Sequence, residues 1–165
     1  MELPFRVEER ESFRVIGHRI RTTNKGGAGR KAIPAQWEEF KTGNLQSTLM
    51  PLMNQEPFGL FGISVYNVDE KDAKVFDHYI AVSSDYEEEG LASYVVPAAS
   101  WAVFPCTVDT LGQTEVQAIS KWLPKSDYKP LNRGYLTGRM KAGAPDLEYY
   151  GEDGTAEVWV AVKKK

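Results

Sequence analysis

The sequence predicts an α+β fold of two βαββ modules related by a pseudo-twofold axis, with antiparallel sheets, helices on one side and a central ligand groove. The first observation is an internal repeat: residues 12–15 (SFRV) and 100–103 (SWAV) share serine, an aromatic residue and valine at the same spacing. The second is the order strand, helix, strand, strand that follows in both halves. Each half is too short to bury both faces of its sheet, so the halves should pack side by side and leave a groove. We therefore expect one domain, residues 1–165, with repeats at 1–86 and 91–165.

The first module begins with a strand and continues through a loop at 24–32 (NKGGAGRKA). We expect a helix to begin at Pro34, because proline is favoured in a first helical turn, and Trp37 and Phe40 lie on one face of it. Gly43 interrupts this helix. The loop lacks the glycine spacing of nucleotide-binding loops and therefore predicts a simple connection.

Two strands complete the first module. Residues 59–67 (GLFGISVYN) and 74–84 (KVFDHYIAVSS) alternate in the period of a strand. The polar run at 69–72 predicts the turn between them.

The second module repeats this order. A strand is expected at 99–106 (ASWAVFPC), a helix at 110–123, and two further strands near 134–140 and at 156–163. The acidic run at 85–91 predicts a solvated linker between the halves.

Composition and charge exclude several classes of protein. The formal net charge of −3 at pH 7 argues against a nucleic-acid-binding surface. The single cysteine, Cys106, excludes an internal disulfide and fits a reducing compartment. The charged N-terminus is unlike a signal peptide, and no segment approaches the roughly 20 apolar residues of a membrane span. These features predict a cytoplasmic protein that binds neither membrane nor nucleic acid directly.

Metal and cofactor sites are not predicted. The only histidines are His18 and His78, too few for a compact zinc site, and His78 alternates with apolar neighbours as a core or core-edge imidazole does. Cys106 is expected to be a small buried side chain, since a pair with His78 would require their strands to adjoin. No nucleophile-elbow motif occurs.

The last strand has an unusual face. Val158, Val160 and Val162 point to one side, and Glu157 and Trp159 point to the other. We expect the helices to cover the valines, so that Glu157 and Trp159 face the groove. A carboxylate among aromatic rings suits an organic cation, because ring faces attract positive charge and the carboxylate supplies the countercharge.

Alternation in other strands directs three more aromatic side chains toward the groove: Tyr66, Tyr79 and Trp101. The alternative is that these rings form core and that Glu157 faces solvent, which is the commoner use of such residues.

Eight segments carry a resemblance to a known family: FRVIGHRIRT, IPAQWEEF, GISVYN, FDHYIAVSSD, SWAVFPC, ISKWLPKSDY, LEYY and AEVWVAVKK. In this order, over nearly the whole chain, the sequence resembles the gyrase-inhibitor-like, or AraC-type, effector-binding domains, which also form the drug-sensing part of MerR-type regulators. The resemblance implies a duplicated βαββ fold with a central hydrophobic pocket and Glu157 as its charged residue. The matching aromatic positions are Trp37, Trp101, Tyr66 and Tyr79.

One departure from the family is the missing DNA-binding module. Many members follow two helix-turn-helix units, whereas the effector domain here begins almost at Met1. The expectation is a stand-alone bacterial domain that is not by itself a transcription factor, although it could take part in transcription regulation by signalling to a partner.

The leading hypothesis is a binding protein for cationic, amphipathic, aromatic drug-like compounds, either a multidrug sensor or a sequestering protein. Its ligand-binding residues would be Glu157, Trp159, Trp101, Trp37, Tyr66 and Tyr79. The first alternative is a hydrolase of small electrophilic compounds that uses Glu157 with Tyr79 or Tyr66. The second is a protein that binds gyrase or a regulator, although no long acidic run is present to mimic DNA. Stand-alone family members of both kinds are known, and fold alone does not transfer their activities.

Overall fold

The computed structural model describes residues 3–66, 68–133, 141–142 and 144–165. Within them, one antiparallel sheet contains β1 (Arg6–Arg10), β2 (Phe13–Thr23), β3 (Leu60–Val65), β4 (Val75–Ser83), β5 (Ala92–Val96), β6 (Ala99–Thr107), β7 (Tyr128–Pro130), β10 (Asp146–Tyr150) and β11 (Thr155–Lys164). A small ribbon pairs β8 (Asn132–Arg133) with β9 (Lys141–Ala142). The helices are α1 (Ala28–Thr42), α2 (Leu45–Leu49), α3 (Leu111–Gln117) and α4 (Leu123–Lys125), and a π-helical turn, Ala118–Trp122, joins the last two. None of the helices in these ranges has the length and hydropathy that a bilayer crossing requires.

The strand order has the symmetry of a duplication. It runs β1-β6-β11-β10-β3-β4-β2-β5, which is the same from both ends if β1 matches β5, β2 matches β6, β3 matches β10 and β4 matches β11. The first strand of each half pairs with the other half, β1 with β6 and β5 with β2. The α+β fold of two related modules is confirmed, and each module has one outer strand more than the predicted βαββ order.

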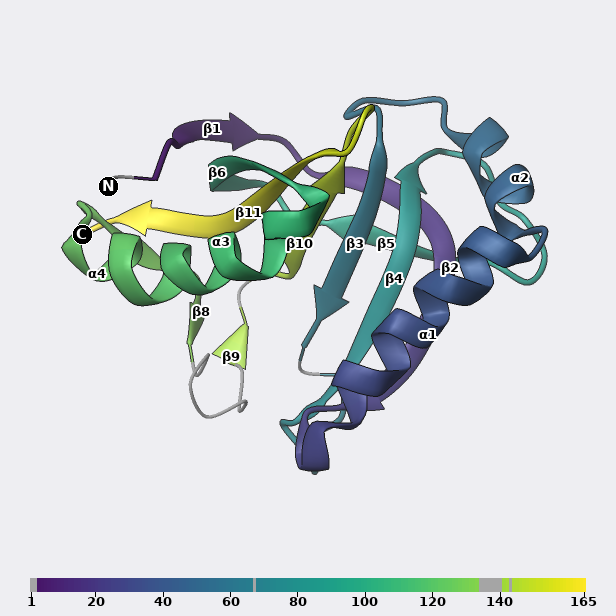
Figure 1. Ribbon diagram of the computed structural model, residues 1–165, viewed down its shortest axis with the longest axis horizontal. Helices are drawn as coiled ribbons and strands as arrows, with labels where there is room; N and C mark the ends of the chain where they lie inside the picture. The colour runs from purple at the N-terminus through teal and green to yellow at the C-terminus, as the bar shows by residue number, and fades with distance from the viewer. Residues whose placement is uncertain (1–2, 67, 134–140, 143) are drawn as a thin grey trace.

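Both long helices lie on one face of the sheet, as predicted (Figure 1). Under α1, Phe40 packs in a cluster with Ile16 and Ile80. Under α3, Leu111 packs in a second cluster with Phe104 and with the valines of β11. Between the two helices lie β3 and β10, where the modules pair with each other.

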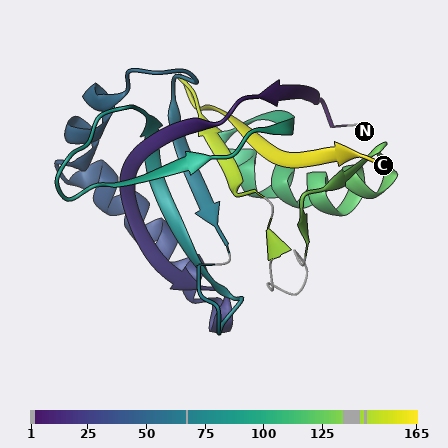
Figure 2. The same ribbon diagram turned by 180° about the vertical axis from the view of Figure 1, so that it is seen from behind.

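The opposite face is closed by the sheet itself. Its outer strands curl over this face, and β2 is strongly bent (Figure 2). A third cluster fills the enclosed space and brings Val96 of β5 together with Trp101 of β6, although five strands separate β5 from β6 in the sheet. This face is therefore a packed core.

The first helix begins earlier than predicted. It starts at Ala28, inside the expected loop 24–32, and Pro34 lies within it. Packing explains the early start, since Gly29 is buried and a methyl group on it would lie 3.1 Å from the Phe76 ring. Contact with the sheet thus outweighs the low helix propensity of glycine.

In the second module, the strand expected near 134–140 falls outside the described residues. The described strand that precedes β11 is β10, which contains the LEYY segment and pairs with both β3 and β11. The alternation in β11 is confirmed: Val158 and Val160 pack beneath α3, and Trp159 and Ala161 pack on the opposite face.

The close approach of β2 to β4 depends on Gly17. A methyl group there would overlap the carbonyl oxygen of Ile80 and lie 2.6 Å from Cα of Ala81. We expect Gly17→Ala to lower the free energy of unfolding by about 2–3 kcal/mol. The matched control is Gly112→Ala in α3, where no atom lies within 4 Å and where alanine should raise this free energy by about 0.5–1 kcal/mol. Urea denaturation measures both, and a Gly17→Ala variant as stable as wild type would contradict the close approach.

Candidate functional site

A small cavity lies on the helical face, over the junction of β3 and β10. Its volume is about 30 Å³, enough for a water molecule or an ammonium-sized group. The polar residues that line it are Ser64, His78, Glu115, Asp146 and Glu148. Because the two modules meet here, and because titratable groups with shifted pKa values gather here, this cavity is the candidate site.

The missing side chain of Gly62 opens this space. Gly62 in β3 pairs directly with Glu148 in β10. A methyl group placed on Gly62 would lie 3.4 Å from Oε2 of Glu148, 3.5 Å from Nε2 of His78 and 3.5 Å from Cζ2 of Trp37. A carboxylate, an imidazole nitrogen and an indole thus converge on one point above the sheet.

Glu148 is the central acid of the site. The hydroxyl of Tyr150 donates a 2.6 Å hydrogen bond to its Oε2. The ring of Tyr150 in turn packs against Trp37, with centroids 4.8 Å apart. Burial raises the pKa of Glu148, and the hydrogen bond from Tyr150 opposes this rise only in part. In the described part of the chain no lysine or arginine pairs with Glu148, so this carboxyl group is open to an external cation.

A second acid reaches the cavity from α3. Glu115 forms no hydrogen bond or ion pair with the described residues. Burial, with a smaller contribution from the charges of Glu148 and Asp146, raises the pKa of Glu115 to about 8. Asp146 is held differently: it accepts hydrogen bonds from the Tyr66 hydroxyl at 2.9 Å and from Nδ2 of Asn132 at 3.2 Å.

His78 is buried, with 4 % of its surface exposed, and is fixed from α1. Its Nδ1 lies 2.6 Å from Oε1 of Gln36. Burial lowers the pKa of His78 to about 4, so the ring is neutral at pH 7. The other nitrogen, Nε2, is the one nearest to the open space above Gly62.

Glu157 lies on the opposite face and does not line this cavity. Its Oε2 pairs with Arg6 at 2.9 Å, and its Oε1 accepts a 3.0 Å hydrogen bond from Nε1 of Trp159. The side chain is 18 % exposed. Its negative charge is therefore compensated within the protein, and a role in ligand binding stays a prediction.

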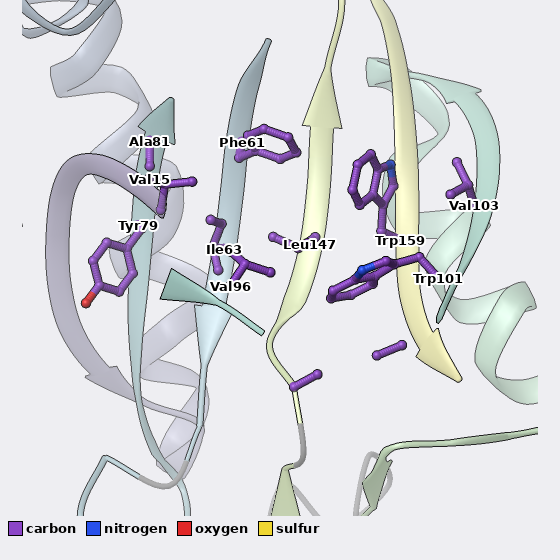
Figure 3. Close-up of a cluster of buried hydrophobic side chains, with 12 residues drawn as sticks. Val15, Phe61, Ile63, Tyr79, Ala81, Val96, Trp101, Val103, Leu147 and Trp159 are labelled. Atoms are coloured by element: carbon purple, nitrogen blue, oxygen red, sulfur yellow. The ribbon is translucent and has the colours of Figure 1, made fainter. Parts of the chain in front are cut away.

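Trp159, Trp101 and Tyr79 belong to the core cluster on that same face (Figure 3). The two indoles lie 5.9 Å apart, and the guanidinium of Arg10 covers Trp159 at 4.9 Å. Tyr79 lies at the other end of the cluster, against Tyr94. None of the three predicted rings is more than 4 % exposed. A ligand could contact them only by displacing core side chains.

Trp37 and Tyr66, in contrast, lie on the helical face. Trp37 projects from α1 on the same side as Phe40, as predicted, and the two rings pack edge-on. Tyr66 follows β3 and packs against Phe76. The six predicted residues are thus divided between the two faces of the sheet. Trp159 of β11 is among the residues that line the cavity, although its ring packs on the far face, and Trp37 reaches the space above Gly62. Glu157 and Tyr79 are separated in the sheet by β10 and β3.

Sequence reasoning did not single out Glu148 or Glu115. A signal for Glu148 was present, because the alternation in LEYY sets this acid on the same face as Tyr150. Cys106 and His78 cannot form the pair that was considered, since three strands lie between β6 and β4. Among the described residues, no group of three metal-ligating side chains occurs.

Comparison with known proteins identifies the family of this chain. A family model described as Cass2, integron-associated effector binding protein, matches residues 6–162. SAV2435 bound to tetraphenylphosphonium superposes with a TM-score of 0.77 and 16% identity, over 98% of this chain and 94% of that one. The integron cassette protein VCH_CASS2 from the mobile metagenome of Vibrio cholerae gives 0.65 and 18%, over 96% and 95%. The C-terminal domain of EcmrR gives 0.59 and 15%, over 100% of both chains.

No curated protein matches the chain. At these identities the structural likeness shows the fold. Together with the family match, it confirms the resemblance to gyrase-inhibitor-like effector-binding domains.

The raised pKa of Glu115 predicts how stability depends on pH. The unfolded chain loses this proton near pH 4.5 and the folded chain near pH 8, so stability should fall as the pH rises through this window. Each pKa unit corresponds to about 1.4 kcal/mol, and for this partly exposed side chain we expect a total loss of about 2 kcal/mol. Glu115→Gln should remove this loss, and Glu87→Gln, in the exposed linker, should retain it. Denaturation midpoints between pH 5 and pH 8 measure the effect; parallel curves for wild type and Glu115→Gln would contradict it.

Proposed function

Because the chain belongs to the Cass2 family of integron-associated effector binding proteins, we propose that it binds an amphipathic aromatic cation at the cavity over the junction of β3 and β10, which we call the groove. The observation that carries the proposal is the carboxyl group of Glu148, which pairs with no lysine or arginine of the described residues and lies beside Trp37 and Tyr150. A cation would supply the missing countercharge, and the two rings would receive its aromatic part.

The size of the cavity indicates how a ligand enters. About 30 Å³ accommodates a charged head group, whereas pockets for drug-sized molecules measure roughly 300 Å³ or more. The aromatic body must therefore separate Trp37 from Tyr150, which are packed together in the unliganded protein. Both side chains are partly exposed, so their movement disturbs little of the buried core.

In the cell the protein would act as a sensor or as a sequestering protein for such compounds. The family match supports small-molecule binding, and SAV2435 is a structural neighbour that binds the lipophilic cation tetraphenylphosphonium. Whether binding is passed on to a regulator depends on a partner, which is a separate question from the chemistry of the groove.

The test compares two carboxylates on opposite faces. Tetraphenylphosphonium and rhodamine are titrated by tryptophan fluorescence into wild type, Glu148→Gln and Glu157→Gln. We expect Glu148→Gln to weaken cation binding about tenfold or more, equivalent to about 1.4 kcal/mol, because it removes the countercharge. Glu157→Gln should stay within about twofold of wild type, because Arg6 already compensates Glu157.

Neutral triphenylphosphine oxide serves as the control ligand. It should bind wild type and both variants with the same affinity, because it carries no charge. The reverse pattern, with loss in Glu157→Gln alone, would move the site to the opposite face, as the sequence predicted. Cation affinities that neither substitution changes would reject both acids as anchors.

One observation favours a second candidate, hydrolysis of a small electrophilic compound. A neutral imidazole nitrogen and a carboxyl group with raised pKa border the same space, so a proton can be held and accepted there. Mass spectrometry of compounds recovered after incubation separates the two candidates. Intact ligand supports the receptor, and a product heavier by one water molecule that disappears in His78→Phe supports the hydrolase.

A further inference from the structure

Two hydrogen-bond acceptors face the open space above Gly62. Oε2 of Glu148 and Nε2 of His78 lie 3.4 Å and 3.5 Å from the position of a methyl group on Gly62. Glu115 adds a second carboxyl group from the side of α3. These three side chains come from β10, β4 and α3 and surround one small volume.

The acceptor state of His78 is fixed by Gln36. Nε2 of Gln36 donates toward the carbonyl oxygens of His18 and His78, both at 3.2 Å, and toward Nδ1 of His18 at 3.1 Å. The amide oxygen of Gln36 is therefore the atom that faces His78, and it accepts a hydrogen from Nδ1 of that ring at 2.6 Å. With its hydrogen on Nδ1, neutral His78 presents a lone pair at Nε2, toward the cavity.

Among the described residues few side-chain donors lie at this point, and one of them is the hydroxyl of Ser64, which lines the cavity. The hydroxyl of Tyr150 satisfies one oxygen of Glu148, and Trp37 faces the space with a ring carbon, Cζ2. No partner of Nε2 of His78 occurs in the described part of the chain, although the residue is only 4 % exposed. A ligand that brought charge without a hydrogen would leave this acceptor unpaired, which is unfavourable in a buried site.

We propose that the ligand carries its charge on a nitrogen with at least one hydrogen, as in a protonated amine or an amidine, and that this N–H group occupies the space above Gly62. It donates to Nε2 of His78 and to Glu148, and its aromatic part extends toward Trp37. The volume of about 30 Å³ fits such a head group better than a nitrogen shielded by four carbon substituents. This inference rests on the proposed function of the groove and specifies its ligand class.

The test uses two ligands that differ in the N–H group. Imipramine is a tertiary amine that is protonated at neutral pH, and its N-methyl quaternary derivative has the same rings and charge without the hydrogen. Calorimetric titration into wild type should show imipramine binding about tenfold more tightly. In His78→Phe, which keeps the ring and removes the acceptor, the two affinities should come within about twofold.

A second variant, Gly62→Ala, tests the same space independently, in case His78→Phe does not fold. In Gly62→Ala the new methyl group meets its neighbours at 3.4 Å or more, so the fold has room for it while the space for the head group is filled. Imipramine should bind this variant at least about tenfold more weakly than wild type. Gly112→Ala, which touches no neighbour, should bind as wild type does.

Tetraphenylphosphonium, titrated in parallel, separates failure of this inference from failure of the proposed function. If it binds in a manner that depends on Glu148 while imipramine has no advantage over its quaternary derivative, the N–H inference is wrong and the groove remains the site. An imipramine advantage that persists undiminished in Gly62→Ala would likewise overturn the inference. If none of the three compounds binds, both proposals fail.

Discussion

The pairing of β3 with β10 is the constraint on which the rest of the structure depends. It joins the two modules into one sheet, and it sets Gly62 directly opposite Glu148. Each helix packs on its own module, α1 over β2 and α3 over β11, so the junction strands lie between two separate hydrophobic clusters. The proposed binding site therefore lies at the seam between the two modules.

Three titratable side chains whose charged forms are disfavoured by burial lie together in the groove. Two acids with raised pKa values and an imidazole with a lowered pKa share a space that a water molecule nearly fills. Such an arrangement costs stability in the free protein, and sites of this kind persist when a ligand relieves the cost. Elsewhere the protein compensates its charges internally, as Arg6 does for Glu157 and Arg21 for Asp77.

Local periodicity was sufficient to predict most of the fold. The strands β2, β3, β4, β6 and β11 and both helical regions follow from alternation and from the echo between Ser12 and Ser100. The site was harder because β11 and β10 each carry an acid next to aromatic residues. The charge of Glu157 is compensated by Arg6, which is 151 residues away in the sequence. The pairing of β1 with β6 brings Arg6 to it, and local sequence patterns do not reveal such a contact. Glu115 likewise resembles a solvated helical residue until α3 is docked on β11.

The exchanged outer strands have a consequence for how such a protein can diversify. A homodimer of single modules could trade its first strands in the same way, but its symmetry axis would repeat every contact between the copies, so that a residue on the axis faces its own copy. In one continuous polypeptide the halves mutate independently. A glycine can therefore face a glutamate across the seam, one helix can bring an indole and the other an acid, and an asymmetric guest can be recognised by an architecture that is nearly symmetric.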